Sequence, residues 1–270
     1  MENKTPQVQT SPPAPVAAPS PQVMEQPKHK FPTETIELPS KGLLYPEGHP
    51  LTSGKIEMKY MTAREEDILT NQNFIANGTV LDKLLQSLII TKIDYDDLLI
   101  GDKNAIMIAS RILGYGKDYE FTYDGEDHTL DLTTLENKEL DETLYTRGQN
   151  EFSYTLPHSG TNITFKLMDG HLEKKIENEI KGLKKINKLS STDLSTRMKH
   201  IITSVEGDTT SKSIRDFVDN YLLARDSRSL REFIRTIQPD INLETTLMVN
   251  GEEKEVEVPI GVSFFFPDAR

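Results

Sequence analysis

The chain has 270 residues, of which 36% are hydrophobic, a formal net charge of -12 and no cysteine. This length is enough to bury a hydrophobic core in one or two domains. Without cysteine there are no disulfides, thiol nucleophiles or zinc-thiolate clusters, and the acidic balance argues against nonspecific binding to nucleic acid or to an anionic membrane. We expect no membrane-spanning segment and no signal peptide, because the chain has neither an apolar run of about 20 residues nor an apolar N-terminal region.

Residues 1–32 form a segment of unusual composition, which holds eight of the 15 prolines mixed with Ala, Ser, Gln and Val. Such a segment cannot bury enough apolar surface to offset the entropy lost on ordering. We therefore predict a disordered tail that acts as a flexible tether. A short docking peptide within it is the alternative.

Two strands and then two helices are predicted after the tail. Residues 35–38 and 56–60 alternate between apolar and polar side chains, as strands with one buried face do. Thr62 is placed to begin a helix, because acidic residues follow it in the first turn. A further helix is predicted from Val80 to Ile89, where apolar residues recur at three- and four-residue spacing.

A helix followed by a hairpin is predicted over residues 98–131. Asp102 is placed to cap the helix, and Gly114 to end it in a left-handed conformation. Asp124 and Gly125 provide the positive φ angles of a tight hairpin turn.

The same unit returns over residues 222–258, where Asp226 takes the capping position, Pro239 stops the helix and Asn250-Gly251 forms the turn. Arg111 and Arg235 each follow the capping aspartate by nine residues. Each lies on the far side of its helix from that aspartate. We therefore expect each to pair with a carboxylate on a neighbouring element or with carbonyls at the helix C-terminus.

Three further pairs of similar segments occur upstream in the same order. They are residues 38–42 with 156–160, 56–62 with 163–169, and 89–94 with 201–206. We therefore predict an α+β fold made by tandem duplication of a unit of two strands, helices and a hairpin, arranged around a pseudo-two-fold axis. The copies would span residues 33–135 and 150–262, joined by a connector at 136–149. Two unrelated lobes with similar turn chemistry are the alternative.

The second copy is predicted to begin with strands at 152–156 and 163–167. Asp169 then caps a helix with an apolar stripe from Leu172 to Ile186, and helices follow over 194–205 and 214–223. Six lysines lie along the first of these helices: Lys174, Lys175, Lys181, Lys184, Lys185 and Lys188. Because glutamates are interleaved with them, we interpret this as a solvated, salt-bridged face. Nucleic-acid or lipid binding is the alternative.

Catalytic and cofactor motifs are not found, so we expect no catalytic residue, cofactor or metal site. Residues 94–97 supply three carboxylates but lack the glycine and distal glutamate of a calcium loop, which favours a solvated turn before a helix. The best hydrolase candidate combines His158 and Ser159 with Asp169 and His171, although a triad needs a geometry that sequence cannot show.

The C-terminal tail, residues 263–270, is rich in aromatic residues. In an extended segment, consecutive aromatic side chains point to both faces, so at least one needs a cover. Packing onto the chain's own hairpin is one interpretation. Docking onto a partner is the other, with Phe264, Phe265, Phe266 and Pro267 as the partner-binding residues, and it predicts that deleting 264–270 abolishes partner binding but leaves the fold intact.

Several segments together resemble the baseplate hub proteins of T4-type contractile-tailed phages. They are residues 36–42 with Tyr45-Pro46, 61–66, 111–116, 226–231 and the Phe-Phe-Phe-Pro ending. The resemblance implies a non-enzymatic component of the phage baseplate that helps to assemble the central hub through contacts with other baseplate or hub proteins. It places the chain in the virion tail, and in the host cytoplasm during assembly, with no nucleic-acid or membrane partner.

Three alternative functions remain beside this resemblance. One is a transient tail assembly chaperone that is absent from the mature particle, another is a hydrolase, and the third is a nucleic-acid binder that uses the lysines from Lys174 to Lys188. The sequence also departs from its relatives, which often carry cysteine pairs suited to a zinc knuckle at the two hairpins. Residues 123–126 and 248–251 hold no cysteine, so no metal site is carried over to them.

Overall fold

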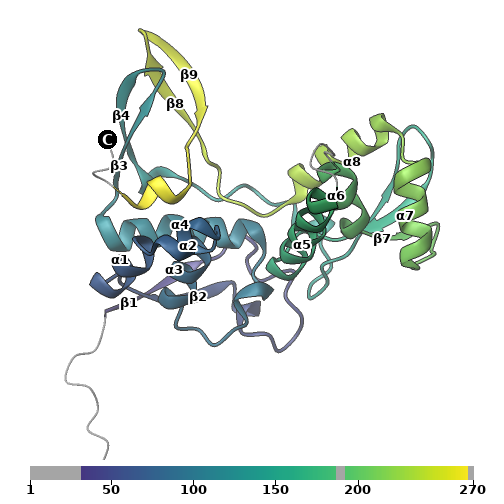
Figure 1. The fold of residues 1–270 in the computed structure, drawn as a ribbon, viewed down its shortest axis with the longest axis horizontal. Coiled ribbons are helices and arrows are strands. Elements are labelled where there is room, and N and C mark those ends of the chain that lie inside the picture. Colours follow the sequence, from purple (N-terminus) through teal and green to yellow (C-terminus); the bar gives the residue numbers. More distant parts are fainter. Residues whose placement is uncertain (1–31, 187–191, 267–270) are drawn as a thin grey trace, which may run out of the picture. The chain divides into compact units, whose positions relative to one another are not determined.

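The computed structural model of the chain describes residues 32–186 and 192–266. These residues belong to one compact unit, which begins at Pro32. The predicted tail therefore lies outside the described residues, apart from Pro32. The unit combines runs of helices with separate antiparallel sheets, which confirms the α+β fold class (Figure 1).

The first half begins with two antiparallel strands, followed by helices and a hairpin. In order, the elements are β1 (Thr33–Glu37), the 3-10 turn η1 (Pro50–Ser53), β2 (Lys55–Lys59), α1 (Ala63–Leu69), α2 (Gln72–Ala76), α3 (Val80–Leu88), η2 (Tyr95–Asp97), α4 (Ile100–Tyr115), β3 (Asp118–Tyr123), β4 (Glu126–Asp131), η3 (Leu132–Thr134) and, in the connector, η4 (Glu142–Leu144). The helix predicted at Thr62 forms with a capping box, in which the Glu65 carboxylate accepts the Thr62 amide at 3.0 Å.

The second half follows a similar order. Its elements are β5 (Phe152–Thr155), β6 (Asn162–Phe165), α5 (Gly170–Ile186), α6 (Asp193–Ile201), β7 (Ile202–Val205), α7 (Ser211–Asn220), α8 (Ala224–Ile237), β8 (Glu244–Val249), β9 (Glu252–Glu257) and η5 (Val262–Phe265). Strand β7 pairs with β6 to make a three-stranded sheet. The helix predicted over 194–205 is therefore wrong beyond Ile201, because the β-branched run at its end pairs as a strand.

Several features recur between the halves. Each has a strand pair, helices, a segment that returns to the second strand, a helix and a hairpin. In the first half the returning segment is only an isolated bridge, between Met58 and Ile89. The second half also has α7 where the first has the short turn η2. This order is compatible with the proposed duplication, which remains a prediction together with its pseudo-two-fold axis.

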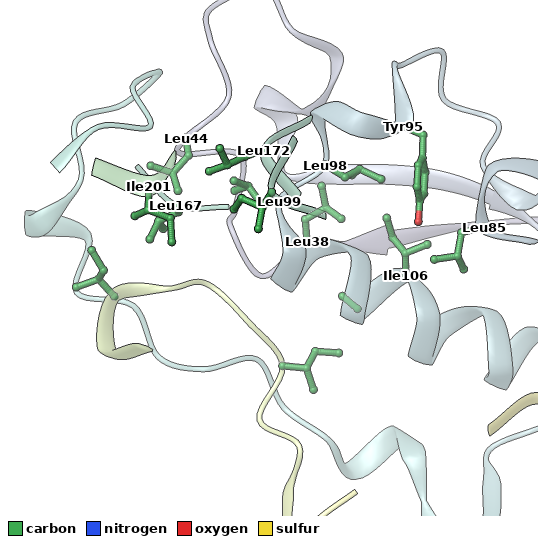
Figure 2. Close-up of a cluster of buried hydrophobic side chains, with 14 of the residues drawn as sticks. Leu38, Leu44, Leu85, Tyr95, Leu98, Leu99, Ile106, Leu167, Leu172 and Ile201 are labelled. Atoms are coloured by element: carbon green, nitrogen blue, oxygen red, sulfur yellow. The ribbon is translucent and has the colours of Figure 1, made fainter. Parts of the chain in front are cut away.

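One hydrophobic core contains residues from both halves of the chain (Figure 2). Its members include Leu38, Leu98, Leu99 and Ile106 from the first half and Leu167, Leu172 and Ile201 from the second. Backbone hydrogen bonds join the halves at this core, since the amide of Ile100 donates to Met168 at 3.1 Å and that of Gly170 donates to Leu98 at 3.1 Å. The halves therefore share one core within the described unit.

The two hairpins form with the predicted turns, in which Asp124 and Asn250 have φ angles of 52° and the glycines that follow them have φ above 80°. The hairpins lie side by side (Figure 1). They contact each other where Phe121 on β3 packs against the cluster of Leu247, Val249 and Val256 on β8 and β9. The predicted helix end at Gly114 is wrong. Helix α4 continues to Tyr115, and Gly116, at φ 87°, follows it.

The connector at 136–149 is tied to the chain between α8 and β8. Asn137 forms an isolated bridge with Ile241, the Lys138 amide donates to the Asp240 carbonyl at 2.8 Å, and the Tyr145 hydroxyl donates to the Ile237 carbonyl.

Among the described residues, no helix has the length and apolar character needed to cross a membrane.

Candidate functional site

A buried carboxylate joins the turn after β1 to the first turn of α4. Asp102 is fully buried and accepts hydrogen bonds from the Ser40 amide at 3.0 Å, the Ser40 hydroxyl at 2.7 Å and the Tyr45 hydroxyl at 2.6 Å. The Tyr45 oxygen in turn accepts the amide of Leu99. Burial raises the pKa of the Asp102 carboxyl, and the hydrogen bonds from Tyr45 and Ser40 oppose this shift. The predicted cap is therefore wrong, because Asp102 binds a distant turn and not its own helix.

Asp226 makes the corresponding contact in the second half. It is fully buried in the first turn of α8, and its carboxylate accepts the amides of His158 at 2.8 Å and Ser159 at 3.0 Å. Burial raises the pKa of this carboxyl, but the hydrogen bonds outweigh burial and lower it overall. The cap predicted for Asp226 is wrong for the same reason.

The two arginines that follow these aspartates have different environments. Arg111 is buried and donates to the carbonyls of Phe264 at 3.0 Å, Gly116 at 3.1 Å and Asp118 at 3.3 Å. The bond to Gly116, directly after α4, agrees with the predicted pairing with carbonyls at the helix C-terminus, and the bonds to Phe264 and Asp118 were not predicted. Arg235 is exposed on α8, where its charge helps to lower the pKa of Glu232 on the same helix.

The C-terminal aromatic residues pack inside the fold. Phe264 and Phe265 are 0% exposed, and the Phe264 ring meets Tyr119 edge to face with centroids 4.7 Å apart. Docking onto a partner is therefore wrong for Phe264 and Phe265, because η5 coils the segment and turns both rings into the core. Phe266 is half-buried beside Phe121 at a hollow of about 540 Å³, and Pro267 lies outside the described residues.

The residues of the hydrolase candidate have separate partners. The amides of His158 and Ser159 bind Asp226, and the Ser159 hydroxyl oxygen accepts the Thr161 amide. Asp169 caps α5 through the Leu172 amide at 2.7 Å, which confirms its predicted capping role. The structure describes no hydrogen bond that links Ser159 to a histidine among the residues that it covers.

His171 instead faces the acidic turn η2. Its Nε2 lies 3.0 Å from Asp97 Oδ1 and 3.7 Å from Asp94 Oδ2, and the ligand atoms of these three residues lie within 4.8 Å of one another. Two carboxylates and an imidazole are donors that suit a divalent transition metal. Asp97 already has a second neighbour, because His49 Nε2 lies 3.2 Å from its Oδ2. The adjacent Asp96 pairs with Lys174 of α5 at 2.5 Å. The cluster is accounted for as a junction between η2 and α5.

The lysine-rich face of α5 is partly salt-bridged, as predicted. Lys174, Lys181 and Lys184 pair with Asp96, Glu177 and Asp193, respectively. Lys188 lies outside the described residues. The apolar stripe of this helix is buried only at its beginning, and Ile186 at its end is 86% exposed.

One surface was not predicted from the sequence. It is a face of α8 that carries four exposed arginines: Arg225, Arg228, Arg231 and Arg235. Their three- and four-residue spacing in the sequence could have indicated that they share one face of a helix.

Comparison of the chain with models of known protein families, with curated proteins and with solved structures finds no match.

Proposed function

We propose that the chain is a non-enzymatic component of a contractile-tail phage baseplate and helps to assemble the central hub through contacts with other baseplate or hub proteins. The observation that carries this proposal is the role of the residues behind the resemblance. Ser40 and Tyr45, in the segment that resembles the hub proteins, both donate hydrogen bonds to the buried Asp102. Asp226, which begins another such segment, holds the turn at His158. These contacts support an architectural role for both segments.

The separation of the hydrolase candidates also supports a non-enzymatic role. A nucleophilic serine needs a base within hydrogen-bond reach. The partners described for Ser159 are the Asp226 carboxylate and the Thr161 amide, and His171 is engaged by Asp97.

Genetic complementation tests the proposal. A phage that lacks this chain should make incomplete baseplates, and the wild-type chain supplied in trans should restore complete tails. The triple variant His158→Ala, Ser159→Ala, His171→Ala should restore them to a similar level. Failure of this variant, when thermal unfolding shows it to be folded, would favour the hydrolase. Normal baseplates without the chain would overturn the proposal.

A further inference from the structure

The solvent-facing side of α8 is a concentrated positive surface, which we call the arginine face: Arg225, Arg228, Arg231 and Arg235. At about 100° per residue, these side chains occupy roughly a third of the helix circumference. Leu230 and Ile237 lie on the opposite side and are buried. The chain has a net charge of -12 and only ten arginines, so four of them on one face make a distinct feature.

Most of this positive charge is not neutralised. Arg228 pairs with Glu232 at 2.8 Å, and the Arg231 Nε donates to the Ser227 carbonyl at 3.2 Å. Arg235 and Arg231 also interact with the charge of Glu232, but less strongly than Arg228 does. For Arg225, no partner is described within the part of the chain that the structure covers. Arg228, Arg231 and Arg235 line a hollow of about 420 Å³ together with Glu232. Guanidinium groups bind carboxylates through two parallel hydrogen bonds, so this surface suits an acidic protein partner.

One such acidic surface is present on the same chain. In the hairpin of β8 and β9, Glu244 lies opposite Glu257, Thr246 opposite Glu255, and Met248 opposite Glu253. These six residues share the exposed side of the hairpin, and we call its four glutamates the glutamate face. No ion pair is described for these glutamates among the residues that the structure covers. Because Glu244 and Glu257 are like charges directly opposite each other, which is a destabilising arrangement, this face gains from a cationic partner.

Exposed apolar side chains accompany both charged faces. Met248 is 57% exposed among the glutamates. Tyr221 and Leu223, immediately before α8, are 64% and 49% exposed. A stable interface needs apolar contacts inside a polar rim, and these residues are placed to supply them on each side.

We propose that the arginine face of one copy of this chain binds the glutamate face of a second copy. The two faces lie on different elements, so the contact is head to tail, and repeating it builds a closed ring or an open filament. The inference goes beyond the proposed function and does not depend on it, because it concerns only contacts between copies of this chain.

Two neutralised variants of the full chain test the proposal. The first carries Arg225→Gln, Arg228→Gln and Arg235→Gln, and the second carries Glu253→Gln, Glu255→Gln and Glu257→Gln. Sedimentation velocity at about 50 mM salt should show oligomers for the wild type and monomers for either variant alone. A mixture of the two should stop at a heterodimer, because only one arginine face and one glutamate face remain to meet. Raising the salt to about 500 mM should weaken wild-type association at least tenfold.

A matched control carries Lys175→Gln, Lys181→Gln and Lys185→Gln on α5, and it should associate like the wild type. A wild type that stays monomeric at about 100 µM and low salt would overturn the proposal. Association that survives in both variants would also overturn it. Binding of a short DNA duplex by a monomeric wild type, lost in the arginine variant, would assign the arginine face to nucleic acid instead.

Discussion

The carboxylate of Asp102 accepts hydrogen bonds from both the amide and the hydroxyl of Ser40, at 3.0 and 2.7 Å. Both residues are fully buried, and 62 positions separate them in the chain. The pair fixes the turn after β1 against the first turn of α4. Because water does not reach these donors, the fold depends on this carboxylate to satisfy them.

Asp102→Ala should lower the free energy of unfolding by about 3 kcal/mol, since it leaves the Ser40 and Tyr45 donors without their acceptor. Urea unfolding measures the loss. The matched control is Asp67→Ala, at an exposed position on α1, which should change stability by less than about 0.5 kcal/mol. Equal effects of the two substitutions would contradict the role assigned to Asp102.

Gly101→Ala should be severely destabilising. A Cβ at this position would lie 1.8 Å from the Pro239 carbonyl oxygen, so either α4 or the segment after α8 would have to move. Gly182→Ala is a control of opposite sign, because a Cβ there meets nothing within 4 Å and α5 is helical at that point. We expect it to raise the stability by about 0.5–1 kcal/mol. Thermal unfolding of both variants should therefore give shifts in opposite directions, and similar shifts would refute the close approach at Gly101.

Phe264→Ala should destabilise the chain by about 3–5 kcal/mol, because it empties a fully buried site next to Tyr119. Phe266→Ala should have a smaller effect, since its ring is half-buried. Equilibrium unfolding of the two variants provides the comparison. If Phe264→Ala keeps wild-type stability, the buried position of that ring is wrong, and the docking interpretation of the C-terminus regains its support.

Glu179 should contribute to stability in a pH-dependent way. It joins three helices, since it accepts hydrogen bonds from Arg215 on α7 at 2.8 and 2.9 Å and lies 2.7 Å from His200 on α6. The hydrogen bonds from Arg215 outweigh the opposing effect of burial and, with those from His200, lower the pKa of Glu179 to about 2. This contribution is therefore fully present above the pKa of the unfolded state, about 4.3, and is lost as the pH falls towards 2.

Glu179→Gln should then cost about 1 kcal/mol at pH 7 and almost nothing near pH 2. The measurement is urea unfolding of both proteins at several pH values across this window. Glu177→Gln, which removes an exposed i,i+4 pair with Lys181, should have little effect at any pH. A difference for Glu179→Gln that does not vary with pH would rule out ionisation as its cause.

Local signals in the sequence predicted much of the fold. The alternation at residues 56–60 identifies β2, and the Asp124-Gly125 and Asn250-Gly251 pairs identify both hairpins. The stripe that begins at Val80 identifies α3. These elements could be predicted because each is determined by residues that are close together in the sequence.

Features that depend on distant parts of the chain were not predictable in the same way. An aspartate at a helix start is usually a cap, and nothing near Asp102 or Asp226 indicates that each holds a turn more than 60 residues away. The surroundings of Phe264 likewise come from distant residues, because its carbonyl accepts from Arg111 on α4 and its ring packs against Tyr119 on β3. The predicted helix over 194–205 was too long, because its periodicity continues through residues 202–205. These residues form a strand because they pair with β6, which is distant in the sequence.

Quantitative mass spectrometry of purified phage particles tests the central claim most directly, by counting copies of this chain against a tail protein of known stoichiometry. We predict a small, fixed, integral number of copies in each particle, as expected of a hub subunit. Abundance in infected cells with none in particles would contradict this prediction and make the chain a transient assembly factor.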